Sequence, residues 1–184
     1  VRALVERGQG PARSGAASGS PAVVVFDAHA DLRDDYLGER LSHATVTRRL
    51  AELVGPENLY LLGVRSGSAA EIAWGRKHVR WFEGALPEAA TAAARELAGR
   101  PVYVSVDIDV LDPAEAPGTG NPEPGGVSFA TLVEALDALR GCPIAGADLV
   151  EVAPPLDPSG RTEVIGAALI RHMLLSWFGK EPLA

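Results

Sequence analysis

The chain has 184 residues, of which 47% are apolar and 22% charged, a composition that supports one domain with a sizeable core and excludes a disordered tail. The formal net charge of −7 argues against sequence-independent binding to nucleic acid, which needs a basic face. Because the single cysteine, Cys142, excludes an internal disulfide framework and the apolar runs are too short to span a membrane, we expect a cytoplasmic protein with no nucleic-acid or membrane partner.

The predicted elements alternate between helices and strands along the chain. Residues 1–7 have the pattern of the end of an amphipathic helix, and residues 8–21, rich in Gly, Ser, Ala and Pro, are expected to form a loop. The elements predicted next are, in order, strand 22–26, helix 43–54, strand 58–64, helix 69–77, strand 79–82, helix 87–98, strand 101–106, helix 128–140, strand 144–150 and helix 162–178. This alternation predicts an α/β fold with a mostly parallel sheet.

Metal-binding residue types follow the first predicted strand directly. Asp27, His29 and Asp31 occupy alternate positions after residues 22–26. Residues two apart on an extended chain point the same way, and ligands of parallel α/β sheets bind at the carboxyl ends of the strands. One such residue alone would more simply cap a turn or face solvent, but three together favour a metal site.

A second pair of carboxylates, Asp107 and Asp109, follows strand 101–106. Two neighbouring buried carboxylates repel each other, so a cation should lie between them. Together with Asp27 and Asp31 they carry four negative charges, which two divalent cations would balance, and His29 adds a nitrogen. Mostly oxygen ligands with one imidazole suit Mn²⁺ better than a closed zinc site.

Three further features adjoin these strand ends. Residues 112–126 contain four prolines and four glycines, so they form either a surface linker or the stiff wall of a pocket. Glu151 follows the last predicted strand, and we prefer it to Asp148 as a third acidic group at a strand end. His43 begins a predicted helix and is either structural or, beside a metal pair, a proton shuttle.

Three motifs, taken in order, resemble those of the ureohydrolase family of arginases and agmatinases. They are DAHAD at 27–31, SVDIDVLDPAEAPGTGNPEPGG at 105–126 and DLVEVAPPLD at 148–157, and the resemblance runs from about Ala22 to the C-terminus. The segments APGTG and SHATVTRR are closer to the agmatinase branch than to true arginases. The resemblance implies a three-layer αβα sandwich around a mostly parallel sheet. It also implies two Mn²⁺ ions, bridged by a hydroxide, that release urea from a guanidino compound.

The same resemblance implies a role for each metal-type residue. By position, Asp27 and Asp107 resemble the carboxylates that bridge the two metals. His29 and Asp109 resemble ligands of one metal, and Asp31 resembles a ligand of the other.

The substrate-binding and proton-transfer residues follow from the resemblance in the same way. His43 matches the proton-shuttle histidine, although the family more often has Gly at the position of Ala44. Glu151 matches the glutamate that receives the substrate guanidinium, and Thr119 falls where a pocket-wall threonine is expected. Asp31 and His43 are the candidates for proton transfer to the leaving amine.

One departure from the family pattern concerns the beginning of the chain. The family carries a Gly-Gly-Asp-His-Ser motif before the strand that leads into DAHAD, its histidine is the sixth metal ligand, and this sequence lacks the motif. We therefore expect an N-terminally truncated fold, in which residues 1–184 are the C-terminal portion of a single ureohydrolase domain and residues 1–21 are a residual helix and loop. One metal would then rely on Asp27, Asp31 and Asp107 alone.

The expected activity is hydrolysis of a small cationic guanidino compound, in the first place agmatine, to give putrescine and urea. Guanidinobutyrate, aminopropylagmatine and arginine are alternative substrates. An inactive truncated fragment is an alternative of a different class. A metal-dependent deacetylase is a third, but its acyl-lysine substrate offers no cation for Glu151 to bind. If complete, the protein is expected to form a homo-oligomer.

Overall fold

A five-stranded, all-parallel sheet forms the centre of the molecule. The computed structural model describes residues 1–8, 21–97 and 99–179. The sheet order is β3-β2-β1-β4-β5, and its strands are β1 (Ala22–Phe26), β2 (Leu59–Leu62), β3 (Arg80–Phe82), β4 (Val102–Asp107) and β5 (Ile144–Val150). The pairings are parallel throughout, which confirms the α/β class predicted from the alternating elements.

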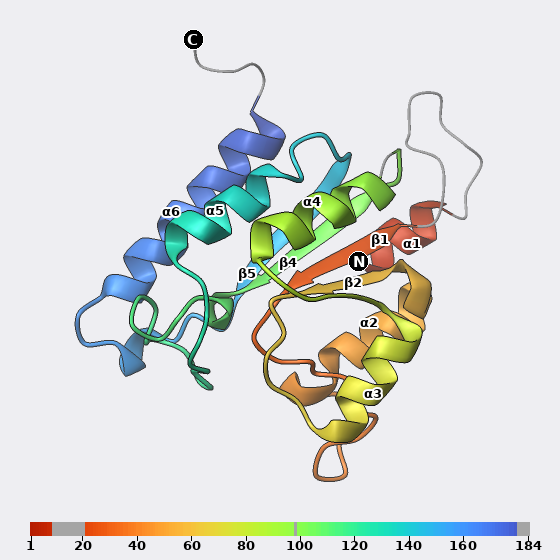
Figure 1. Ribbon diagram of the computed structural model, residues 1–184, viewed down its shortest axis with the longest axis horizontal. Helices are drawn as coiled ribbons and strands as arrows, with labels where there is room; N and C mark the ends of the chain where they lie inside the picture. Colours follow the sequence, from red (N-terminus) through yellow and green to blue (C-terminus); the bar gives the residue numbers. More distant parts are fainter. Residues whose placement is uncertain (9–20, 98, 180–184) are drawn as a thin grey trace.

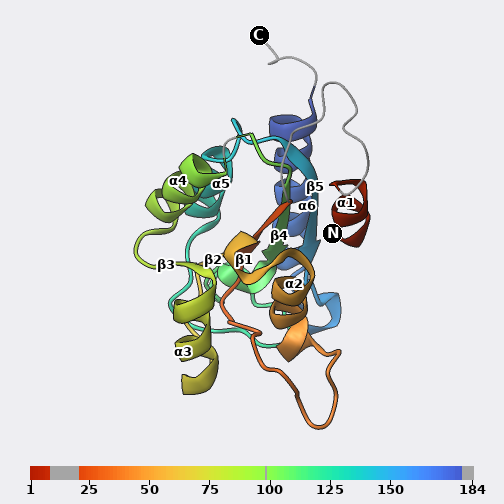
Figure 2. The ribbon, with the colours of Figure 1, turned by 90° about the vertical axis from the view of Figure 1, so that its right-hand side faces the viewer.

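Helices cover both faces of this sheet (Figures 1 and 2). The helices are α1 (Arg2–Gly8), α2 (Val46–Val54), α3 (Ala69–His78), α4 (Leu86–Glu96), α5 (Phe129–Asp137) and α6 (Arg161–Met173). One apolar cluster packs α4, α5 and α6 against one face, and a second packs α1, α2 and α3 against the other. The predicted three-layer αβα sandwich is therefore confirmed. No helix in the described part of the chain is both long enough and apolar enough to cross a membrane.

The central strand β1 is covered on both faces, which explains why its sequence is apolar at every position. Ala22, Val24 and Phe26 point into the cluster beneath α4–α6, while Val23 and Val25 point into the other cluster. Alternate side chains thus enter opposite layers, as the two-residue repeat of a strand requires. Strand β1 lies between β2 and β4, so the carboxyl ends of three strands meet at one edge of the sheet.

Several predicted boundaries shift in the structure. Strand β2 ends at Leu62 because Gly63 takes a φ of +90°, and a Cβ atom there would lie 2.7 Å from a methyl carbon of Val110. The helix predicted over 43–54 begins with a 3₁₀ turn at His43–Thr45, and that predicted over 128–140 ends at Asp137. The helix predicted over 162–178 continues from α6 as a π-helical turn, Leu174–Phe178. Residues 9–20 of the predicted first loop and residue 98 lie outside the described part.

Candidate metal and substrate site

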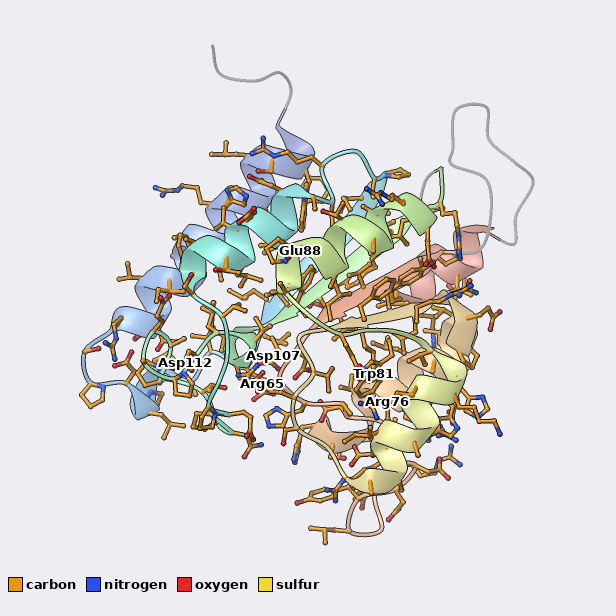
Figure 3. The ribbon with its side chains drawn as sticks, in the orientation of Figure 1. Arg65, Arg76, Trp81, Glu88, Asp107 and Asp112 are labelled. Carbon is orange, nitrogen blue, oxygen red and sulfur yellow. The ribbon has the colours of Figure 1, made fainter. Side chains whose placement is uncertain are left out.

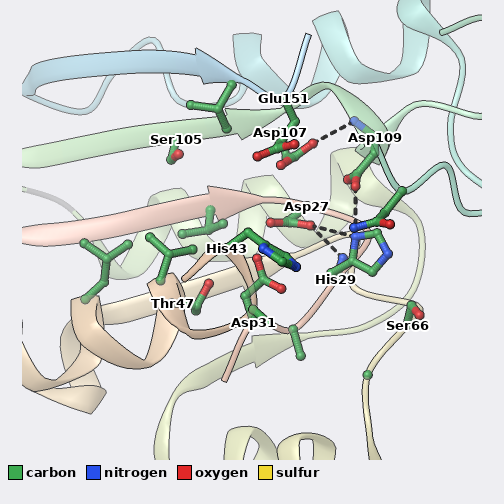
Figure 4. Close-up of a pocket in the computed structure, with 18 of the residues that line it drawn as sticks. Asp27, His29, Asp31, His43, Thr47, Ser66, Ser105, Asp107, Asp109 and Glu151 are labelled. Carbon is green, nitrogen blue, oxygen red and sulfur yellow. Dashed lines mark hydrogen bonds and ion pairs between the residues drawn. The ribbon is translucent and has the colours of Figure 1, made fainter. Parts of the chain in front are cut away.

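A cleft of about 1170 Å³ opens at the carboxyl ends of the strands. It is lined by all but one of the predicted site residues, namely Asp27, His29, Asp31, His43, Asp107, Asp109 and Glu151. Figure 4 shows these side chains gathered in one part of the cleft. They come from the ends of β1, β4 and β5 and from the 3₁₀ turn that precedes α2. The predicted residues therefore lie together at the edge of the sheet where the sequence analysis placed them.

The tightest group in the cleft consists of Asp27, His29 and Asp109. His29 Nδ1 lies 2.8 Å from Asp109 Oδ2, and the backbone N–H of His29 donates to Asp27 Oδ1 at 2.6 Å. One ligand atom from each of the three residues lies within 4.8 Å of the others. Among the described residues, Asp31 and Asp107 line the same cleft but fall outside this tight group.

Two turns carry the predicted metal ligands, one after β1 at residues 27–31 and one after β4 at residues 107–111, and we call them the motif turns. The backbone of the second turn differs from the extended chain that the sequence suggested. An extended chain was expected to point Asp107 and Asp109 the same way. Instead β4 ends at Asp107, whose carboxylate accepts the N–H of Asp109 at 3.0 Å and caps a 3₁₀ turn, Ile108–Val110. That turn carries the carboxylate of Asp109 across to Ala28 N–H, at 3.1 Å, and to His29. The backbone is still extended at Asp107 and leaves the extended conformation at Ile108, and both carboxylates line the same cleft.

The loop after β1 is also curled. Asp31 has a φ of +49°, in the left-handed region that a non-glycine residue seldom adopts. Its neighbours hold it there, because Leu32 N–H donates to Glu71 Oε1 at 3.1 Å and Arg48 N–H donates to the Asp31 carbonyl at 3.1 Å. Strain of this kind persists where the surroundings determine the conformation, often at functional sites.

Glu71 was missed by the sequence analysis. Its buried carboxylate accepts hydrogen bonds from Leu32 N–H, Ser68 N–H and the Arg33 side chain, so it joins the Asp31 loop to the start of α3. The signal was present, because Ser68 and Glu71 have the spacing of a capping box at a helix N-terminus.

The pKa values of the carboxylates reflect their crowding. Burial, followed by repulsion from the neighbouring acids, raises the pKa of Asp31 to about 8 and that of Asp107 to about 10. Burial also raises the pKa of Asp27 to about 6. Hydrogen bonds to Asp109 and Asp27 raise the pKa of His29 to about 10. Burial opposes ionisation of Asp109, but hydrogen bonds from His29 and Ala28 N–H keep its pKa below the usual value.

This donor set fits divalent cations. Four carboxylates and one imidazole share a partly closed cleft, and the carboxylates destabilise one another's charged forms when no cation is bound. Carboxylate oxygens with a single imidazole nitrogen are a ligand set that hard or borderline divalent ions accept. The residues present are thus compatible with the metal site that the motifs predicted.

Two of the three proposed substrate residues are exposed and the third is buried. Glu151 is exposed at the cleft and has a left-handed φ of +63°. His43 is also exposed, and its ring packs edge-on against Tyr36, with 5.3 Å between the ring centroids. Thr119 is buried and lies behind the cleft wall, where Gly120 and Asn121 take the lining positions. Its hydroxyl has no hydrogen-bond partner among the described residues.

Asp148, the alternative to Glu151, also lines the cleft but is already hydrogen-bonded. Its two oxygens accept hydrogen bonds from Tyr103 Oη at 2.8 Å and Ser105 Oγ at 2.6 Å. Burial and this contact with Asp148 raise the pKa of Tyr103 to about 12. Glu151, with its carboxylate at the exposed end of the strand, remains the better candidate for contacting a cationic substrate.

Comparison with known proteins agrees with this geometry. The model of the family described as "Arginase family" matches residues 9–176. The chain belongs to the arginase family. This arginase-family chain is 48% identical over 161 residues to an agmatinase of Halalkalibacterium halodurans, covering 85% of the chain and 55% of that protein. It is 39% identical to a guanidinobutyrase of Pseudomonas aeruginosa, and the match covers 85% of the chain and 52% of that protein.

Solved structures lead to the same family. The structure of agmatine ureohydrolase of Thermoplasma volcanium matches with a TM-score of 0.77 and 32% identity, covering 87% of the chain and 56% of that protein. These similarities confirm the predicted resemblance to the ureohydrolases and to their agmatinase branch, and they do not favour the deacetylase alternative. The arginase-family chain spans about half the length of the curated relatives it matches.

Proposed function

We propose that this chain supplies the metal-binding and guanidinium-binding residues of a ureohydrolase that converts agmatine to putrescine and urea. The observation that carries the proposal is the convergence of Asp27, His29 and Asp109 in one cleft, with Glu151 at the same cleft. The high identity to agmatinases supports agmatine as the substrate. We further propose that residues 1–184 belong to a single ureohydrolase domain.

Five residues would hold two Mn²⁺ ions in this proposal. Asp27 and Asp107 would bridge the ions, His29 and Asp109 would bind one of them, and Asp31 would bind the other. When bound, such a metal pair supplies a hydroxide nucleophile at neutral pH. The chain's own residues then have to bind the substrate, orient it and transfer protons to the leaving nitrogen.

Glu151 would bind the substrate guanidinium. A guanidinium is planar and stays protonated, and a carboxylate can accept two parallel hydrogen bonds from it. This contact would hold the guanidinium carbon in a fixed position beside the metal ligands, which removes much of the entropic cost of the reaction. The wall formed by residues 120–123 would line the cleft beside Glu151, since a Cβ atom at Gly120 would lie 3.7 Å from Glu151 Oε2, and the buried Thr119 precedes this wall in the chain.

The reaction consumes one water molecule, whose oxygen ends in urea and whose two protons end on the leaving nitrogen. Oxygen adds to the guanidinium carbon as hydroxide, and the bond from that carbon to the alkyl-bearing nitrogen breaks as the proton of the added hydroxyl passes to this nitrogen. The amine that leaves then takes up the proton released when the hydroxide formed, and becomes an ammonium group. Asp31 and His43 line the cleft and are the groups proposed to deliver the proton to the leaving nitrogen.

The test compares purified protein with an Asp107→Ala variant made in a full-length form, both loaded with Mn²⁺. We expect the unaltered protein to release urea and putrescine from agmatine faster than it releases urea from guanidinobutyrate or arginine, and we expect Asp107→Ala to abolish urea release. Asp137→Ala, which removes a carboxylate on α5 that pairs with Arg140, is the matched control. Turnover retained by Asp107→Ala at equal metal content would contradict the assignment.

A further inference from the structure

The side chain of Arg65 forms an unusual set of hydrogen bonds beside the cleft. Arg65 follows β2 and is half-buried (Figure 3). Its guanidinium donates to five backbone carbonyl oxygens, those of Asp109 at 2.7 Å, Val110 at 3.3 Å, Leu111 at 3.4 Å, Glu123 at 2.6 Å and Pro124 at 3.1 Å. The first three belong to the turn after β4, and the other two belong to the loop that walls the cleft.

The backbone at Arg65 is fixed to a third segment. The N–H groups of Arg65 and Ser66 both donate to the carbonyl of Ala28, at 2.8 and 2.9 Å, and Ala30 N–H donates to the Ser66 carbonyl at 3.0 Å. The segment between Asp27 and Asp31 is therefore held by the main chain at Arg65. One residue thus connects both motif turns with the cleft wall.

The chemistry of arginine explains why one side chain can do this. A guanidinium presents five N–H donors in a rigid planar fork, whereas a lysine ammonium presents three donors from a single point. The carbonyls of Asp109 and Glu123 accept from the same Nη2 atom, at 2.7 and 2.6 Å, so the fork bridges the turn and the loop directly. Hydrogen bonds from a charged donor are stronger than those between neutral groups.

The part of the loop that lines the cleft depends on this contact. The loop is fixed on one side by Gly118, which donates to Thr162 Oγ1 and accepts from Ala153 N–H. On the other side, Gly125 and Gly126 donate to the Asp112 carboxylate. The lining residues 120–123 lie between these anchors, and Arg65 binds the carbonyls at their end.

We propose that Arg65 is a positioning residue that ties the turn carrying Asp109 to the cleft wall at residues 120–123. Through this tie, the metal ligand Asp109 and the wall that faces the substrate keep a fixed distance from each other. Arg65 touches neither metal nor substrate in this proposal. Its predicted effect on KM rests on the proposed hydrolysis of agmatine, and its effect on Mn²⁺ affinity rests on the proposed metal ligands, but its effect on the loop rests on neither.

The test uses Arg65→Met, which removes the donors, and Arg65→Lys, which keeps the charge. Arg76→Met is the control, because Arg76 on α3 also makes two hydrogen bonds, to the exposed side chain of Glu83. Three quantities are measured in each protein: amide hydrogen exchange over residues 109–127, Mn²⁺ affinity by calorimetry, and kcat and KM for agmatine.

We expect Arg65→Met to exchange faster over residues 109–127 while exchange in β1 and β4 stays unchanged. We expect its Mn²⁺ affinity to fall by about 10-fold to 100-fold, the range seen when groups that orient metal ligands are removed. KM for agmatine should rise, Arg65→Lys should recover part of each effect, and Arg76→Met should match the unaltered protein.

Unchanged loop exchange and unchanged Mn²⁺ affinity in Arg65→Met would overturn the proposal. Faster exchange throughout the sheet would also overturn it, since that result indicates a general loss of stability. If Arg65→Met does not fold, the same criteria are applied to Arg65→Lys. Absence of agmatine turnover in the unaltered protein would refute the proposed function instead, and would leave the exchange and metal-binding results to decide the role of Arg65.

Discussion

His29 and Asp109 stand at the ends of two different strands, and their side chains meet with 2.8 Å between Nδ1 and Oδ2. Asp109 also accepts the N–H of Ala28 through its other oxygen. The two motif turns are therefore joined directly, side chain to side chain and side chain to backbone. This pair is a side-chain contact within the candidate metal site that joins residues from two different strand ends.

The pair leads to a prediction about metal binding. Asp109→Asn keeps the shape of the side chain but removes its charge, so we expect Mn²⁺ affinity to fall by more than about 10-fold. His29→Ala should have a similar effect because it removes the nitrogen ligand. Isothermal titration calorimetry measures the Mn²⁺ affinity of both variants, and Asp137→Asn on α5 is the control. Affinities equal to that of the unaltered protein would exclude these residues as ligands.

Glu151 should affect the substrate rather than the metal. Glu151→Gln removes the charge that would pair with the guanidinium, and we expect KM for agmatine to rise by about 10-fold to 100-fold, the range for hydrogen bonds to charged groups. Mn²⁺ affinity should stay unchanged. Steady-state kinetics and calorimetry separate the two effects, and Glu88→Gln, on the exposed side of α4, serves as the control. A fall in metal affinity without a change in KM would contradict the proposed role.

Glu71 should matter for stability, because its carboxylate accepts hydrogen bonds from the buried N–H of Leu32 in the Asp31 loop and from the N–H of Ser68 at the start of α3. Glu71→Ala leaves the N–H groups of Leu32 and Ser68 without this acceptor, and we expect the free energy of unfolding to fall by about 1–3 kcal/mol. Equilibrium unfolding in urea measures this free energy. Glu83→Ala breaks only an exposed ion pair with Arg76 and should cost less than about 1 kcal/mol. Equal effects of the two substitutions would show that Glu71 does not hold the loop.

Asp157 should make part of the stability depend on pH. Its carboxylate accepts hydrogen bonds from the hydroxyls and N–H groups of both Ser159 and Thr162, which together hold the pKa of Asp157 well below its usual 3.8. Because the pKa is lower in the folded chain than in the unfolded chain, the stabilisation is complete above the unfolded value and is lost as the pH falls.

The corresponding experiment compares Tm for the unaltered protein and Asp157→Asn across acidic and neutral pH. We expect the variant to melt several degrees lower near neutral pH and the gap to close as the pH falls below about 4. Asp35→Asn, in an exposed turn, is the control. A gap of the same size at every pH would show that ionisation of Asp157 contributes nothing to folding.

The patterns in the amino-acid sequence were sufficient to predict an α/β fold with a mostly parallel sheet. The segment 22–26 is apolar at every position because both faces of β1 are covered, and alternation with helical segments indicated parallel strands. Since the carboxyl ends of parallel strands meet at one edge, the sequence also predicted that Asp27 and Asp107 face a common cleft. These features depend on short-range patterns and on general rules of sheet topology.

Only the tertiary structure decided how the side chains at that edge are oriented. The 3₁₀ turn that aims Asp109 at His29, the left-handed backbone of Asp31 and the burial of Thr119 behind the wall all depend on contacts with distant segments. Arg65 is the clearest case, because its partners are backbone carbonyls, which every residue has. The residue types do not indicate which backbone carbonyls will accept hydrogen bonds from Arg65, so this contact can be identified only in the folded chain.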